Sequence, residues 1–158
     1  MFAVIHAPSS VQAGWPAQRA GAVLTVHLDA VAHNYRLVKA LAPGAVCAAV
    51  VKADAYGLGV AQVAPVLAQA GATQFFVAHV DEGLALRPHV GAQAGITVLH
   101  GPRPDAVEAC LAHGLRPVLN SLEQIGRVRA VACKQQRTVG VVLQLDTGMS
   151  RFGLSVQD

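Results

Sequence analysis

Residues 45–59 read AVCAAVVKADAYGLG, and this stretch indicates the fold. Its first part, the nearly continuous apolar run Ala45–Lys52, is typical of a β-strand covered on both faces, as the strands of parallel sheets are. The polar, glycine-containing residues that follow predict a loop. A buried strand that runs into such a loop is the start of a βα unit.

The same rhythm continues on both sides of this stretch. A leading strand is predicted at Ala22–Leu28, and later strands at residues 74–80, 96–101, 116–120 and 138–146. Helices are predicted between them, at 29–42 with Asp29 as N-cap, at 60–71, 81–90 and 104–114, and at 121–134 with a Ser-x-x-Gln capping box. Five such strands after a leading one permit an open doubly wound α/β sheet or an unfinished (β/α)8 TIM-type barrel. A complete barrel needs about 250 residues, so the chain would form roughly half of one.

The composition excludes several classes of protein. A hydrophobic share of 53% with 13% charged residues excludes intrinsic disorder, and no apolar run approaches the ~20 residues of a membrane span. The net charge of +3 is spread thinly and only 4% of residues are aromatic, which disfavours nucleic acid as a partner. The three cysteines form no CxxC motif, which favours a reducing compartment. We therefore expect a soluble chain with neither a nucleic-acid nor a membrane partner.

The first 20 residues differ from the rest of the chain. They lack the basic start and the apolar core of a signal peptide, and they are interpreted as a flexible leader. The sequence thus predicts one folded unit over residues 21–158 and residence in the cytoplasm.

Two predicted strand ends carry side chains that could act in catalysis or ligand binding. Lys52 closes a buried strand, at the end where active sites of parallel sheets lie. Its amine would be a usable base or Schiff-base nucleophile there, although a lysine that only reaches solvent is the plainer interpretation. Tyr56 follows in a glycine-rich loop, where its phenol could bind a phosphate or carboxylate or simply pack at the strand end.

A second candidate segment is LDTGMSRFG, Leu145–Gly153, which follows the last predicted strand. Arg151 could bind a carboxylate or an aromatic oxygen through two N–H groups, and a structural clamp between Asp146 and Arg151 is the alternative.

The remaining polar residues suggest no site. The seven histidines, with His79 and His100 at strand ends, lack metal-ligand spacing. Asp81 and Glu82 are interpreted as charges that begin a helix, and Arg87 and Arg103 as solvated side chains.

The two segments AVVKADAYGLG and LDTGMSRFGL together resemble the fold-type III pyridoxal-phosphate alanine racemases, and FFVAHVDEGLALR and LRPVLNSLEQ match the same pattern. The resemblance covers the chain from about Gly21 onward, as the N-terminal half of such an enzyme. It implies that Lys52 forms the Schiff base with pyridoxal 5'-phosphate and is the base on one face of the substrate. It implies also that Tyr56 binds the cofactor phosphate, and that Arg151 binds the cofactor phenolic oxygen and the substrate carboxylate.

The resemblance implies an isomerase that interconverts L- and D-alanine, for D-alanine biosynthesis and peptidoglycan precursors, as a cytoplasmic homodimer. The second base would come from the half that this chain lacks, so we expect residues 1–158 alone to be inactive. A pyridoxal-phosphate-binding barrel without catalysis and a racemase of another amino acid remain alternatives. Two positions depart from the pattern: Gln144 stands where relatives have a carbamylated lysine that braces the arginine, and Leu58 where many have histidine. We expect the Gln144 amide to orient Arg151 by a hydrogen bond, without the negative charge of that brace.

Overall fold

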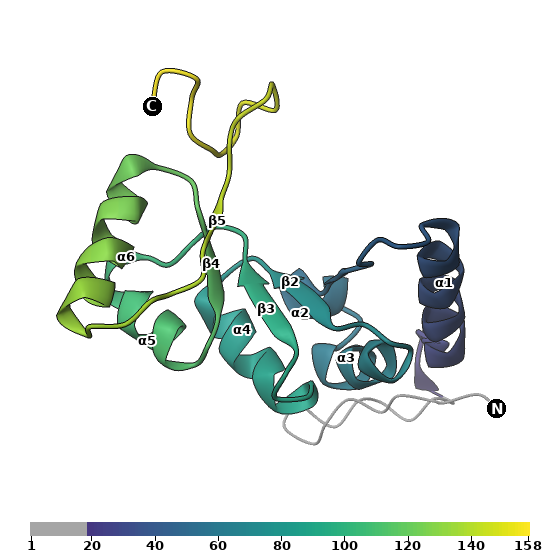
Figure 1. Cartoon of the computed structure of the whole chain (residues 1–158). Coiled ribbons are helices and arrows are strands. Elements are labelled where there is room, and N and C mark those ends of the chain that lie inside the picture. Colours follow the sequence, from purple (N-terminus) through teal and green to yellow (C-terminus); the bar gives the residue numbers. More distant parts are fainter. Residues whose placement is uncertain (1–18) are drawn as a thin grey trace.

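The computed structural model describes residues 19–158, and these form a five-stranded parallel sheet with helices between the strands (Figure 1). The strands are β1 (Ala49–Val50), β2 (Gln74–Val77), β3 (Gly95–Val98), β4 (Arg116–Leu119) and β5 (Val142–Leu143). They lie in the order β1-β2-β3-β4-β5, so each strand pairs with the next along the chain. A doubly wound sheet reverses its order at a switch point, whereas a (β/α)8 barrel winds sequentially. The sheet is therefore the first part of a barrel, as expected.

Among residues 19–158, five helices occupy the predicted intervals, and a sixth, at Lys52–Tyr56, forms where a loop was predicted. They are α1 (Leu28–Leu41), α2 (Lys52–Tyr56), α3 (Val60–Gln69), α4 (Val80–Leu86), α5 (Val107–Ala112) and α6 (Leu122–Lys134), with 3-10 turns η2 (Arg87–His89) and η3 (Pro104–Ala106). In Figure 1, α1 and α6 lie at opposite ends of the molecule, and the segment after β5 projects away from the sheet. No helix within residues 19–158 is long and apolar enough to cross a membrane.

The hydrophobic core lies between the sheet and the helices. Phe75, Val77, Ile96 and Val98 are fully buried in one cluster with α3 and α4 side chains, and burying one such side chain stabilises the fold by about 1.5–3 kcal/mol. Because side chains alternate along a strand, the residues between them point to the opposite face. On that face Val50 is 45% exposed. Lys52 lies two residues beyond Val50, at the start of α2 and at the carboxyl end of β1.

The expected leading strand is absent. Residues 22–27 have no strand structure, and Leu24 is 77% exposed. A strand exists only where a neighbour supplies hydrogen bonds, and these residues find none beside β1. The two edge strands are also shorter than predicted, at two residues each, because each pairs on one side only. The leader expected at residues 1–20 lies almost wholly outside the described residues.

The helix starts follow the sequence with one correction. Ser121 caps α6, since its side chain accepts a hydrogen bond from the Gln124 backbone N–H. Asp29 is not the cap of α1: His27 takes that position and Asp29 lies in the first turn. A carboxylate in the first turn still favours the helix through its dipole.

Candidate functional site

Lys52 stands at the carboxyl end of β1, at the start of an unusual turn. The last ladder bond joins Val51 N–H to the Phe76 carbonyl at 2.9 Å. From Ala53 to Tyr56 the backbone φ angles lie between 51° and 58°, so this turn is left-handed. Such a conformation costs a residue with a side chain about 1–2 kcal/mol. The predicted loop is thus a strained, ordered turn, and strain of this kind occurs at functional sites when surrounding contacts maintain it.

Hydrogen bonds at both ends hold the turn. Ala55 N–H bonds the Val51 carbonyl at 3.0 Å, and Gly57 N–H bonds the Ala53 carbonyl at 2.8 Å. The Asp54 carboxylate accepts from Val60 N–H at 2.7 Å, which ties the turn to the start of α3. The backbone beside Lys52 is consequently fixed, so the turn restricts where its amine can reach.

Glu82 adds a long-range support that the sequence analysis missed. One carboxylate oxygen accepts from Ala53 N–H at 2.8 Å, and the other accepts from the N–H groups of Ala78 at 2.6 Å and His79 at 3.2 Å. Burial would raise the pKa of Glu82, but these three hydrogen bonds and the charge of His79 hold it below its ordinary value. The capping of α4 was readable from Glu82 lying three residues after His79. The contact to Ala53 was not, because those residues lie on different βα units.

Replacing Glu82 by glutamine should lower the free energy of unfolding by about 1–2 kcal/mol, because one charged acceptor for three N–H groups is lost. The carboxylate is only partly buried, so we expect the lower end of the range. The contribution of Glu82 exists above its unfolded-state pKa of about 4.3 and disappears as the pH falls through the lower folded value. Urea unfolding at pH 7 and pH 3.5 measures this difference.

The control for this prediction is Glu123→Gln. Glu123 pairs with Arg127 on exposed α6, and its loss should change stability by less than about 0.5 kcal/mol. If the Glu82→Gln variant is as stable as this control at pH 7, Glu82 does not clamp the turn, that is, its hydrogen bonds to Ala53, Ala78 and His79 do not stabilise it.

Tyr56 ends the left-handed turn with its side chain 63% exposed. The Lys52 ammonium lies 6.0 Å from the centre of its ring, so the two predicted residues are neighbours. The phenol forms no hydrogen bond with the described residues and is free to bind a ligand. This exposure favours a phenol that binds a ligand over one that packs at the strand end.

The Arg151 loop is shaped by Asp146 rather than by a pair between the two residues. Asp146 Oδ1 accepts from the N–H groups of Gly148 and Ser150, each at 3.0 Å. The hydrogen bond from Ser150, then that from Gly148, lowers the pKa of Asp146. Gly153 closes the loop at φ 115°, where a Cβ atom would approach Asp146 N to 2.7 Å. The Asp146–Arg151 clamp considered from the sequence is therefore wrong, and Arg151 is left available.

Gln144 acts on the loop backbone. Its Nε2 donates to the Phe152 carbonyl at 3.0 Å. An amide at this position was expected to bond the Arg151 guanidinium, in place of the brace that relatives have. That expectation is wrong, since the amide holds the residue next to Arg151 instead.

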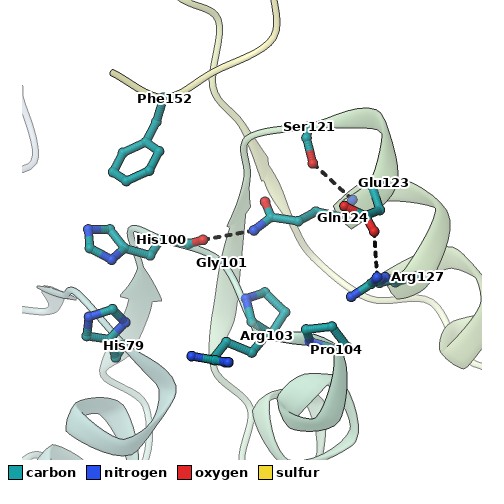
Figure 2. Close-up of a pocket in the computed structure, with 11 residues that line it drawn as sticks. His79, His100, Gly101, Arg103, Pro104, Ser121, Glu123, Gln124, Arg127 and Phe152 are labelled. Carbon is teal, nitrogen blue, oxygen red and sulfur yellow. Dashed lines mark hydrogen bonds and ion pairs between the residues drawn. The ribbon is translucent and has the colours of Figure 1, made fainter. Parts of the chain in front are cut away.

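His79 and His100 connect the two candidate segments. Their rings lie 4.5 Å apart, edge to face, and the Phe152 ring lies 4.8 Å from His100. They line one side of a hollow of about 360 Å³ that reaches Arg103 and the start of α6 (Figure 2). The sequence analysis interpreted both as plain strand-end or loop histidines. Their positions at the ends of neighbouring strands could have predicted that the two rings meet.

The charges at this end of the sheet act on one another. Burial lowers the pKa of His100, and the charges of His79, Lys52 and Arg151 lower it further, while Glu82 opposes them. The charges of Lys52 and Arg151, from the two ends of the described sheet, thus both act on the same imidazole. Neither forms an ion pair with a carboxylate among residues 19–158.

The two remaining arginines, which the sequence analysis interpreted as solvated, do contact other parts of the structure. Arg87 is not simply solvated, because its Nη1 donates to the Ala94 carbonyl at 2.9 Å. Arg103 lines the hollow. Within residues 19–158 no three His, Cys, Asp or Glu side chains gather as metal ligands would.

Curated relatives of this chain are alanine racemases. The Brucella ovis alanine racemase is 46% identical over 139 residues, which cover 88% of this chain and 35% of that protein. The catabolic alanine racemase of Agrobacterium fabrum is 48% identical over 135 residues, or 85% of this chain and 35% of that protein. The chain thus spans about a third of the length of these relatives.

Solved structures of racemases share the fold. Alanine racemase from Bartonella henselae, with covalently bound pyridoxal phosphate, has a TM-score of 0.80 and 37% identity over 82% of this chain and 38% of that one. Histidine racemase from Leuconostoc mesenteroides has a TM-score of 0.72 and 30% identity over 80% of this chain and 34% of that one. The family described as alanine racemase, N-terminal domain, matches residues 26–158. The chain therefore belongs to the alanine racemase family, as part of its N-terminal domain.

Proposed function

We propose that this chain is the cofactor-binding part of a pyridoxal-phosphate-dependent racemase of alanine, with Lys52 as the residue that binds the cofactor covalently. The observation that carries this proposal is the amine of Lys52 at the carboxyl end of β1, on a left-handed turn that Glu82 clamps. The bound pyridoxal phosphate of the Bartonella henselae relative supports it.

The chemistry of the site fits this cofactor. Pyridoxal phosphate is an aldehyde with an anionic phosphate and a phenolic oxygen, so it needs an amine and hydrogen-bond donors. Among residues 19–158, Lys52 and Arg151 have no carboxylate partner and the Tyr56 hydroxyl forms no hydrogen bond. The Arg151 guanidinium carbon lies 5.7 Å from the Phe152 ring centre. The inner face beyond Val50 is open and can admit a flat ring.

Each residue has one task in the proposed reaction. The bound cofactor supplies an electron sink that acidifies the α-proton of the amino acid. Once the amino group of the substrate has replaced it on the cofactor, the freed Lys52 amine would accept that proton on one face. Arg151 would bind the substrate carboxylate through two N–H groups, and Tyr56 would donate to the phosphate. Racemisation also needs a proton donor on the opposite face. We place that donor outside these residues, so residues 1–158 alone should not racemise alanine.

The wider setting is part of the same proposal. The resemblance of the two motifs favours a cytoplasmic homodimer that makes D-alanine for peptidoglycan. A racemase of another amino acid is the second candidate, since histidine racemase has the same N-terminal fold.

Covalent labelling tests the proposal. The protein is incubated with pyridoxal phosphate and reduced with borohydride, and the modified peptide is identified by mass spectrometry. We expect the label on Lys52. A label on Lys39, which bonds the Gly71 carbonyl, or on Lys134, which pairs with Glu108, would overturn the assignment.

The complete protein then distinguishes the candidates. Proton exchange at the α-carbon in deuterated water, with chiral analysis, is measured for alanine, serine, lysine and histidine. Fastest exchange and inversion of alanine is the expected result. Faster reaction of another amino acid favours the second candidate, and labelling without exchange indicates a barrel that binds the cofactor without catalysis.

A further inference from the structure

A line of ring contacts joins the second strand end to Arg151. The His79 and His100 rings meet edge to face with their planes at 81°. The Phe152 ring lies on the other side of His100, and the Arg151 guanidinium carbon lies 5.7 Å from the Phe152 ring centre. Figure 2 shows the three rings in this order, with His100 between His79 and Phe152.

His100 is held firmly by its own backbone. Its N–H donates to the Ala78 carbonyl at 3.1 Å, and its carbonyl accepts from Gln124 Nε2 at 2.9 Å. Gly101 follows at φ 67°, where a Cβ atom would approach the Val118 carbonyl to 2.5 Å. The imidazole therefore stands on a backbone that is hydrogen-bonded to the end of β2 and to α6 and that passes close to β4.

The Arg151 loop is tied to the sheet by a backbone hydrogen bond at its base, where Gln144 N–H donates to the Leu119 carbonyl at the end of β4 at 3.1 Å. Its other hydrogen bonds join residues 144–154 to one another: Asp146 N–H to the Leu154 carbonyl, Leu154 N–H to the Gln144 carbonyl, and those that Asp146 and Gln144 make with the loop. The Phe152 ring is 38% exposed and touches His100. Beyond its base, the internally bonded loop thus contacts the strand ends through this ring pair.

We propose that His100 is a positioning residue, a platform for Phe152 that holds the Arg151 guanidinium at the site of Lys52. What Arg151 does there rests on the proposed function, but the positioning does not. The ring stays neutral at neutral pH. His79, Lys52 and Arg151 face it as positive or titratable groups and disfavour its protonation, and Glu82 is the opposing carboxylate.

Trypsin tests the platform without any cofactor, because it cleaves the Arg151–Phe152 bond in the loop itself. The cleavage rate after Arg151 is compared with that after exposed Lys134, in the same digest. We expect His100→Ala to raise the ratio about fivefold, from the loss of one ring contact. His100→Phe keeps a ring and should stay within about twofold of the unmodified protein. Arg103→Ala, in the same hollow but away from the stack, is the matched control.

Phe152→Ala guards against a folding defect, since it removes the other ring from an exposed position. It should raise the ratio as His100→Ala does, and the double variant should go no further, because both changes remove one contact. An unchanged ratio in Phe152→Ala overturns the proposal. A His100→Phe variant with the same cleavage ratio as His100→Ala also overturns it.

The pH dependence of the cleavage ratio distinguishes a titrating imidazole from a ring that only fills space. A lowered pKa means that the neutral ring supports the loop above the ordinary histidine pKa of about 6.5, and that this support is lost as the pH falls through the folded value. The cleavage ratio of the unmodified protein should therefore rise toward pH 5, and that of His100→Phe should stay flat. Equal pH profiles overturn the proposal.

The outcome is separable from the proposed function. Borohydride labelling of Lys52 without any trypsin effect of His100→Ala refutes the platform alone. A trypsin effect without cofactor labelling refutes the function alone.

Discussion

Replacing Lys52 by alanine will abolish covalent attachment of pyridoxal phosphate and the absorbance band that accompanies it. No other described amine stands on the inner face at the strand ends, since Lys39 bonds the Gly71 carbonyl and Lys134 pairs with Glu108. The affinity for the cofactor should fall by at least about 100-fold, because a covalent link is replaced by weak polar contacts. Absorbance titration with borohydride reduction measures the loss.

Lys39→Ala is the control for this result, because it removes an exposed lysine on α1 whose amine bonds the Gly71 carbonyl. It should keep the band unchanged. If Lys52→Ala retained a reducible band of normal intensity, the assignment of the site to the β1 end would be wrong. Circular dichroism of both variants shows whether the fold is kept.

Replacing Arg151 by lysine should cost more activity than replacing Gln144 by alanine. Lysine cannot offer two parallel N–H groups to a carboxylate, so we expect a loss of about 30- to 100-fold in the complete protein. Gln144→Ala removes one neutral hydrogen bond, to the Phe152 carbonyl, worth about 1 kcal/mol and so about fivefold. Exchange of the α-proton of alanine in deuterated water measures both.

The trypsin ratio separates the two mechanisms. Gln144→Ala acts on the loop backbone and should raise cleavage after Arg151, whereas Arg151→Lys keeps a positive charge and a trypsin site at residue 151 and should leave the ratio unchanged. Equal losses of activity in the two variants would contradict the assignment of substrate contact to Arg151.

Local pattern made much of the fold predictable. Apolar runs that end in polar loops predict the parallel strands, because a strand that is covered on both faces is apolar along nearly its whole length. Ser121 revealed the start of α6 because capping is decided within one helical turn. The edge strands and the absent strand at 22–27 were not predictable in this way, because a strand depends on a neighbour that its own residues do not encode.

The sequence by itself determined the βα series, the place of Lys52 at a strand end and the motifs shared with racemases. Only the tertiary structure decided the left-handed turn after Lys52, its clamp by Glu82 and the contact of Phe152 with His100. The physical reason is the distance along the sequence between the residues that interact. Helix caps and buried strands follow from residues a few positions apart, whereas side chains from different strand ends meet only after the sheet has curled and brought its carboxyl ends together.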